Sequence, residues 1–192
     1  MAPSPCSFLK STSRGSLEST FKGFVHRFAT GDQLSHMLWG AKKIIGKFGS
    51  LHGCFSKGLQ TKDETVLPAM SNFTRQLISR TNDPGHLLAL PEKGSACKRM
   101  NLFLRWMVRR DNVDPGGWDD MPVHKLIIPL DVHMHRIGLT LNMTRRGQAD
   151  LRTALEITAG FKRLSPQDPV KYDFALTRIG IRNDMRLEEV LS

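Results

Sequence analysis

The stretch IIPLDVHMHR, at residues 127–136, places Asp131 directly before a segment with the apolar spacing of a helix. Asp131 can cap that helix, as aspartates at this position most often do, by accepting a hydrogen bond from an early N–H group. It can bind a metal with His133 and His135, or its carboxylate can help to break a bond in a substrate. Residues two apart on a helix point to different faces, so we expect no metal site here.

Lys98 is the second candidate for chemistry, because it falls in the first turn of the helical segment SACKRMNLFLRWMVRRDNVD, residues 95–114. This segment is apolar nearly all round, which predicts a central, buried helix. Burial and the positive end of the helix dipole both disfavour the ammonium form of a lysine, and the neutral amine is a nucleophile. The alternative is a lysine that reaches solvent from a helix end and has no chemical role.

The elements that must position these residues are helices. Apolar residues recur at helical spacing and no alternating run persists, so we predict an all-α fold, a compact helical bundle. We expect Asp32 to cap the first of these helices and Gly49 to end it, and Asp168 and Pro169 to begin the last. The helix after Asp131 should turn Val132, Ile137 and Leu141 inward. The predicted helices cover residues 31–49, 63–80, 95–114, 132–142, 147–164 and 168–181.

Length and composition predict one domain. The chain has 192 residues, of which 40% are apolar, enough to bury a core. Residues 1–19 are rich in Ser, Pro and Thr and read as a flexible leader or a transit peptide, which leaves residues 20–192 as a single helical domain. The formal net charge of +10 and the pI near 10.0 suggest a polyanionic partner such as nucleic acid or an acidic membrane. The densest basic run, without an acid, is residues 98–110.

The three cysteines, Cys6, Cys54 and Cys97, are far apart in the sequence. This spacing argues against a disulfide framework, a structural zinc site and a cysteine-ligated iron–sulfur cluster, and it favours a reducing, cytoplasmic setting. No apolar run is long enough to span a bilayer, so we expect no membrane partner. We also expect a monomer.

The motif IPLDVHMHRIG resembles the signature of the helix-hairpin-helix superfamily of DNA glycosylases with a Gly/Pro-rich loop, in which a Pro-apolar-Asp-x-His run carries the catalytic aspartate. Lys98, in KGSACKRMNLFLRWMV, matches the nucleophile of the lysine-bearing branches, which opens the second helix of the hairpin. Asp131 lies 33 residues after Lys98, a spacing more like that of the archaeal 8-oxoguanine branch. The stretch from about Phe21 also resembles a bacterial family of unassigned function within or beside this superfamily.

The resemblance implies a DNA glycosylase with abasic-site lyase activity, acting on a damaged purine of the 8-oxoguanine type in duplex DNA and needing no cofactor. It places the catalytic half at about residues 85–192, and it would make a bacterial chain nucleoid-associated. Lys98 would attack the sugar, and Asp131 would stabilise the positive charge that develops there. A degenerate hairpin would hold the DNA backbone through Gly94, Ser95, Ala96 and Arg99, with His133 and Arg136 as further contacts. We expect Trp118 to stack on a base and Trp106 to lie in the core.

Two other readings stay open. Relatives in the superfamily carry helices before the part that matches Phe21, and PEKGSAC keeps only one hairpin glycine, Gly94. A DNA-binding protein without catalysis would fit these departures. A basic helical module that binds protein or lipid would fit the charge alone.

Overall fold

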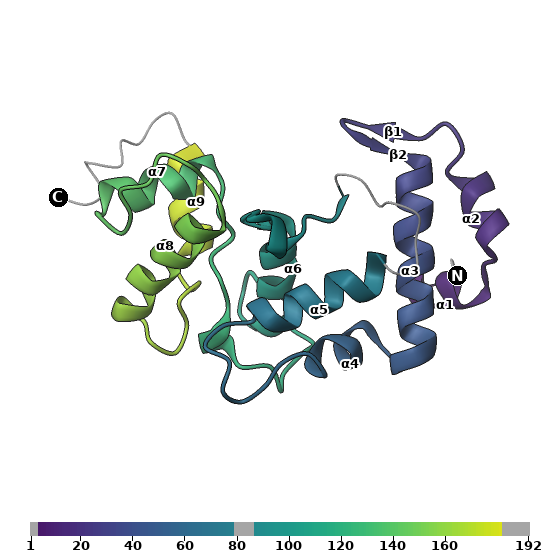
Figure 1. Cartoon of the computed structure of the whole chain (residues 1–192), viewed down its shortest axis with the longest axis horizontal. Coiled ribbons are helices and arrows are strands. Elements are labelled where there is room, and N and C mark those ends of the chain that lie inside the picture. The colour runs from purple at the N-terminus through teal and green to yellow at the C-terminus, as the bar shows by residue number, and fades with distance from the viewer. Residues whose placement is uncertain (1–3, 79–86, 182–192) are drawn as a thin grey trace. The chain divides into compact units, whose positions relative to one another are not determined.

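The computed structural model of the chain describes residues 4–78 and 87–181 (Figure 1). The predicted all-α class is confirmed, because the described part is mostly helical with one small two-stranded sheet. The chain divides into two compact units where we expected one domain. Unit 1 comprises residues 1–60 and 69–89, and unit 2 comprises residues 61–68 and 90–192.

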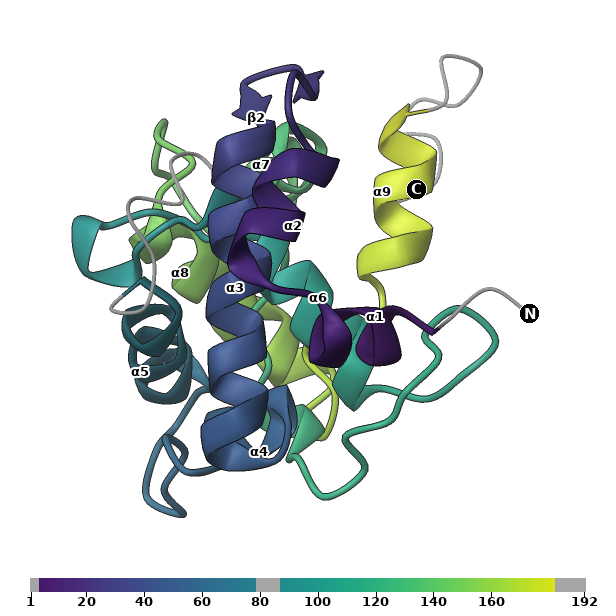
Figure 2. The same cartoon turned by 90° about the vertical axis from the view of Figure 1, so that its right-hand side faces the viewer.

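Unit 1 is built around α3, the longest described helix. Both views show α1 and α2 beside α3, which also contacts α4 and β2 (Figures 1 and 2). The segment that we expected to be a flexible leader thus forms α1 and α2 from residue 5 onward, because Leu17 is fully buried and Lys42 donates hydrogen bonds to the carbonyls of Lys10 and Thr12. The elements of this unit are α1 Pro5–Ser11, α2 Arg14–Thr20, β1 Val25–His26, β2 Ala29–Thr30, α3 Gly31–Phe48, α4 Leu51–Ser56 and, mostly, α5 Leu67–Ile78.

The cap of α3 differs from the prediction. Thr30, not Asp32, is the N-cap: its hydroxyl accepts from the Gln33 N–H, and the Gln33 side chain accepts from the Thr30 N–H. This reciprocal pair is a capping box, which satisfies two N–H groups at once. The predicted end is correct, because Gly49 follows the helix with φ of 80°, a conformation that favours glycine.

Unit 2 contains the residues that we singled out for chemistry. Its core includes Leu104, Ile128, Met134, Ile137 and Ile157, all essentially inaccessible to solvent. Helix α7 packs closely against α8, since a Cβ added to Gly138 would lie 2.4 Å from the Ile157 side chain. The elements are η2 Pro91–Lys93, α6 Lys98–Val108, η3 Val123–Lys125, α7 Val132–Thr140, α8 Leu151–Leu164 and α9 Asp173–Ile181.

Two predicted faces are wrong in detail. Helix α6 is buried on one side only, and two of the four residues on that side, Asn101 and Arg105, are polar. In α7, Val132 is 74% exposed and Met134 takes the inward position beside Ile137.

The last helix starts later than predicted. Helix α9 begins at Asp173 rather than at residues 168–169. The Asp168 carboxylate accepts instead from the Val170 N–H and from the Arg109 guanidinium, so it closes a turn before the helix.

Candidate functional site

Asp131 caps α7, as predicted. Its Oδ1 accepts a hydrogen bond of 2.8 Å from the Met134 N–H. The residues before it are buried, and the Ile128 N–H donates to the Thr158 hydroxyl of α8 at 3.0 Å. Both ends of this short stretch are therefore fixed, so the carboxylate is held at one place.

Lys98 is the first residue of α6, and two residues shortly before it have left-handed backbone. Gly94 has φ of 76°, and Cys97, the residue just before the helix, has φ of 47°. The Gly94 carbonyl accepts from the Leu151 N–H at 2.9 Å, which ties this approach to the start of α8. Asn101 donates from its amide nitrogen to the Ala96 carbonyl at 3.0 Å and braces the turn from inside.

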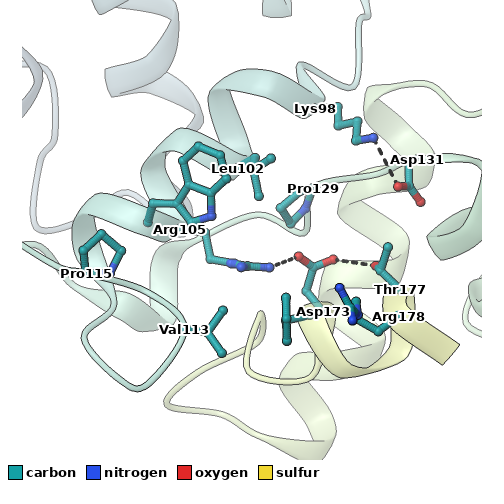
Figure 3. Close-up of a pocket in the computed structure, with 12 residues that line it drawn as sticks. Lys98, Leu102, Arg105, Val113, Pro115, Pro129, Asp131, Asp173, Thr177 and Arg178 are labelled. Atoms are coloured by element: carbon teal, nitrogen blue, oxygen red, sulfur yellow. Dashed lines mark hydrogen bonds and ion pairs between the residues drawn. The ribbon is translucent and has the colours of Figure 1, made fainter. Parts of the chain in front are cut away.

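The structure brings Lys98 and Asp131 together. Lys98 Nζ lies 3.1 Å from Asp131 Oδ2, and the exposed fractions of the two side chains are 49% and 14%. Lys98 is thus half exposed, so burial does not desolvate it as we expected from an all-apolar helix. Both residues line one pocket of about 550 Å³ within unit 2, which is in the usual size range of small-molecule sites (Figure 3).

A second ion pair lies beside the first in the same pocket. Figure 3 shows the Arg105 guanidinium directed at the Asp173 carboxylate, which also accepts from the Thr177 hydroxyl. Arg105 and Asp173 are almost fully buried, at 4% and 5% exposed. This pair joins α6 to the first residue of α9, so it fixes one wall of the pocket relative to Lys98.

The Arg105–Asp173 pair belongs to a larger buried cluster. Asp114, which is inaccessible to solvent, accepts from Arg105 at 2.9 Å and also pairs with Arg109. Arg109 further pairs with Asp111 at 2.8 Å and with Asp168 at 2.9 Å. Two guanidinium groups therefore face four carboxylates, an excess of negative charge that favours protonation of one of them.

The two carboxylates of the pocket have opposite pKa shifts. Burial raises the pKa of Asp173 to about 6 against the influence of Arg105, and the charge of Asp131 raises it further. Burial also acts to raise the pKa of Asp131, but the Met134 N–H and the Lys98 ammonium outweigh it and bring that pKa below its usual value. Asp131 is therefore ionised near neutral pH, whereas the Asp173 carboxyl group, with its pKa of about 6, changes its charge just below neutral pH.

The hairpin residues that we expected to hold a phosphate are largely committed elsewhere. The Gly94 N–H donates to the Pro91 carbonyl at 2.9 Å, and Ala96 is only 8% exposed. The Ser95 hydroxyl accepts from the Cys97 N–H at 3.2 Å. This turn therefore does not present three free backbone N–H groups to an anion.

The remaining predicted DNA contacts lie in helices α6 and α7. Arg99 and Arg136 are exposed, and the His133 ring is near enough to Asp131 to lower its pKa. His135 is directed elsewhere, since its Nε2 lies 2.7 Å from the Arg146 carbonyl oxygen. Over residues 4–78 and 87–181, no group of three His, Cys, Asp or Glu side chains is placed to hold a metal.

The two tryptophans exchange the places that we predicted. Trp118 is 5% exposed and packs edge-on against Phe103, with 5.5 Å between the ring centroids. Trp106 is 43% exposed and lines the pocket. Phe174 of α9 is 43% exposed in the same pocket. Sequence reasoning missed Asp173, because Asp173 and its partner Arg105 are 68 residues apart and no local pattern joins them.

The described residues therefore define a helical protein with a lysine–aspartate pair at the rim of a largely apolar pocket. The chain belongs to DUF2400, a family of proteins of unknown function whose family model matches residues 1–182. No curated protein and no solved structure matches the chain. Among the described helices, none is long and apolar enough to cross a membrane.

Proposed function

We propose that this chain is a DNA glycosylase with abasic-site lyase activity, which removes a damaged purine of the 8-oxoguanine type through a Schiff base on Lys98. The observation that carries the proposal is the pairing of Lys98 Nζ with Asp131 Oδ2 at 3.1 Å in the wall of a pocket. The resemblance of IPLDVHMHRIG and of the Lys98 segment to the lysine-bearing glycosylases supports it. The basic character of the chain suits a DNA substrate.

The geometry gives each residue a part. Asp131 is the base that takes a proton from the Lys98 ammonium across 3.1 Å, which leaves the amine as the nucleophile. The Lys98 nitrogen bonds to the sugar C1′ while the bond from C1′ to the base breaks, and its electron pair leaves with the base, which is then protonated. Asp131 passes the proton that it took from Lys98 to the leaving base, and the carboxylate that this restores stabilises the positive charge on the sugar.

The second half of the reaction follows from the same adduct. Loss of a proton from the nitrogen and opening of the sugar ring give an imine between Lys98 and C1′. Removal of a C2′ proton then expels the 3′ phosphate and breaks the C3′–O bond. Hydrolysis of the imine returns the free lysine, so no oxidant, reductant or cofactor is consumed.

The pocket suits a planar base. Trp106 and Phe174 supply exposed aromatic surface in its wall, and aromatic faces bind bases by stacking. Arg105 and Asp173 supply a donor and a titrating carboxyl group beside Lys98. A base turned out of the duplex would meet stacking and polar groups together.

Borohydride trapping tests the proposal. The wild-type protein is mixed with a duplex that carries an abasic site, or 8-oxoguanine, and sodium borohydride is added to reduce any imine to a stable amine. We expect a covalent protein–DNA adduct, with the modified peptide containing Lys98 in mass spectrometry. Lys98→Ala should lose the adduct, and Lys162→Ala, a matched change on α8, should keep it.

The alternative is a DNA-binding protein without catalysis. The observation that favours it is that Lys98 and Asp131 form an ion pair, which can simply fasten α6 to α7. Salt-sensitive duplex binding with no trapped adduct would support this alternative. An adduct that persists undiminished in Lys98→Ala would rule out the assigned nucleophile.

A further inference from the structure

Six of the ten large apolar side chains that are exposed in the described part of the chain fall into two groups. Trp106, Val113 and Phe174 line the pocket. The other group lies in unit 1, on the hairpin of β1 and β2, where Phe24, Val25 and Phe28 are 45%, 69% and 79% exposed. We call residues 24–28 the hairpin tip; Figure 1 shows the hairpin at the N-terminal end of α3.

The turn of the hairpin holds an arginine in a conformation that favours glycine. Val25 pairs with Thr30 and His26 with Ala29, so Arg27 and Phe28 are the two turn residues. Arg27 has φ of 56°, and a positive φ at the first turn residue is the position that glycine usually fills in such hairpins. Glycine adopts this backbone conformation without a steric penalty and a residue with a side chain does not, so an arginine here suggests that its side chain serves a purpose.

The surroundings of the tip are basic. Residues 21–31 contain Lys22, His26 and Arg27 and no acid. The described part of unit 1 as a whole has nine basic and two acidic side chains. Asp32, in the first turn of α3, is the acid that follows the hairpin. A surface that joins exposed aromatic rings to cations and holds few acids complements a polyanion with flat, stackable groups.

We infer that the hairpin tip is a wedge that enters the base stack of duplex DNA, with Val25 and Phe28 against the bases and Arg27 on a phosphate. Proteins that kink DNA insert one or two apolar side chains between base steps, flanked by basic residues, and the tip offers that number. An anionic membrane is a weaker match, because stable attachment to its surface requires a broad apolar face or a lipid anchor, and the tip has three apolar side chains.

The wedge shares its partner with the proposed function but uses none of the same residues. It concerns unit 1 alone, and it adds a DNA contact that the Lys98 chemistry does not require. The two proposals are therefore separable: loss of the borohydride adduct speaks to Lys98, and loss of duplex distortion speaks to the tip.

The experiment combines duplex binding with a probe of base stacking. Fluorescence anisotropy gives the Kd for an undamaged duplex, and 2-aminopurine in that duplex brightens when a neighbouring base is unstacked. We expect the double variant Val25→Ser, Phe28→Ser to bind about ten-fold more weakly or worse, since one stacked aromatic contributes that much, and to lose the 2-aminopurine signal. Leu164→Ser is the matched control, because it removes a similarly exposed apolar side chain from α8, and it should behave as wild type.

Variants of Arg27 separate a DNA contact from a structural role, because the two roles predict different changes in Tm and in Kd for duplex DNA. Arg27→Gly relieves the backbone conformation, so its Tm should be equal to or above that of the wild type. It should nevertheless bind duplex more weakly. The slope of log Kd against log salt concentration should become shallower by the amount that corresponds to the loss of about one phosphate contact. Arg27→Lys should keep that salt dependence.

Each opposite result overturns the wedge. Unchanged Kd and unchanged 2-aminopurine fluorescence in the double variant would remove the tip from the DNA interface. Wild-type binding to vesicles of phosphatidylcholine and phosphatidylserine in equal parts, lost in the double variant while duplex binding stays, would assign the tip to a membrane instead. Circular dichroism of each variant confirms that the helices are intact.

Discussion

Unit 1 carries nine basic and two acidic side chains over its described residues, whereas unit 2 carries sixteen and twelve. The units also place these charges differently. In unit 1, Lys43 and Lys47 are exposed along α3, and Lys43 lies over the ring of Trp39 at 4.7 Å. In unit 2, Arg105 and Arg109 are buried among four carboxylates.

This difference separates charge that can meet a partner from charge that builds the fold. The run of residues 98–110 is the densest basic segment of the sequence, yet two of its arginines are buried in ion pairs and hold the pocket together. Exposed cations occur in both units, but in unit 1 fewer acids balance them, since its nine basic side chains face two acidic ones. The density of basic residues along the sequence therefore says little about where a polyanion would bind, because folding brings distant acidic residues close to them.

The largest effect that we predict breaks the buried cluster of unit 2. Arg105→Ala leaves Asp114 and Asp173 buried without their main cation, and removal of one member of such a buried pair lowers the free energy of unfolding by about 3–5 kcal/mol. Lys43→Ala, an exposed change in unit 1, should lower it by less than about 1 kcal/mol. Urea denaturation of both variants measures the contrast, and equal losses would contradict the division into structural and outward charge.

The next effect depends on pH. Asp173 has a pKa of about 6 in the folded chain and about 3.8 in the unfolded one, so the folded state binds the proton more tightly. Stability from this group is present at low pH and is lost as the pH rises from about 4 through 6. Two pKa units correspond to about 3 kcal/mol, and Asp173→Asn, which mimics the protonated group, should not show that loss.

The measurement is the difference in unfolding free energy between Asp173→Asn and the wild type, taken near pH 4 and near pH 7.5. We expect the asparagine variant to gain on the wild type at the higher pH, and the other titrating groups cancel in the difference. A constant difference across this range would show that Asp173 is ionised throughout, paired with Arg105.

Local features were predictable from the sequence, and the reason is that they depend on residues close together in the chain. The helices around Lys98 and after Asp131, the cap at Asp131 and the end of α3 at Gly49 follow from short-range spacing and hydrogen bonding. Even here the prediction of Asp32 as the cap of α3 was wrong, because Thr30 forms a reciprocal pair of hydrogen bonds with Gln33.

Features that depend on distant residues were not predictable. The buried ion pairs of Arg105 were not predicted, because its partners Asp114 and Asp173 lie 9 and 68 residues away. Trp106 looked buried in an apolar helix, but α6 is covered on one side only, and the loop residue Trp118 packs inward against Phe103 instead. The pairing of Lys98 with Asp131 was expected only from the resemblance to the lysine-bearing glycosylases, since no spacing rule places two residues 33 apart side by side.

The smallest effect on stability separates the two roles of Asp131. Asparagine is as good an N-cap as aspartate, so Asp131→Asn should keep the bond to the Met134 N–H and lower the free energy of unfolding by no more than about 0.5 kcal/mol. Thr30→Ala, which removes the hydroxyl of the cap in unit 1, should cost about 1 kcal/mol. In the borohydride assay the order reverses: Asp131→Asn should lose the adduct, because an amide cannot take the proton from Lys98, and Thr30→Ala should retain it. If Asp131→Asn traps DNA as well as the wild type does, Asp131 serves α7 as a cap alone.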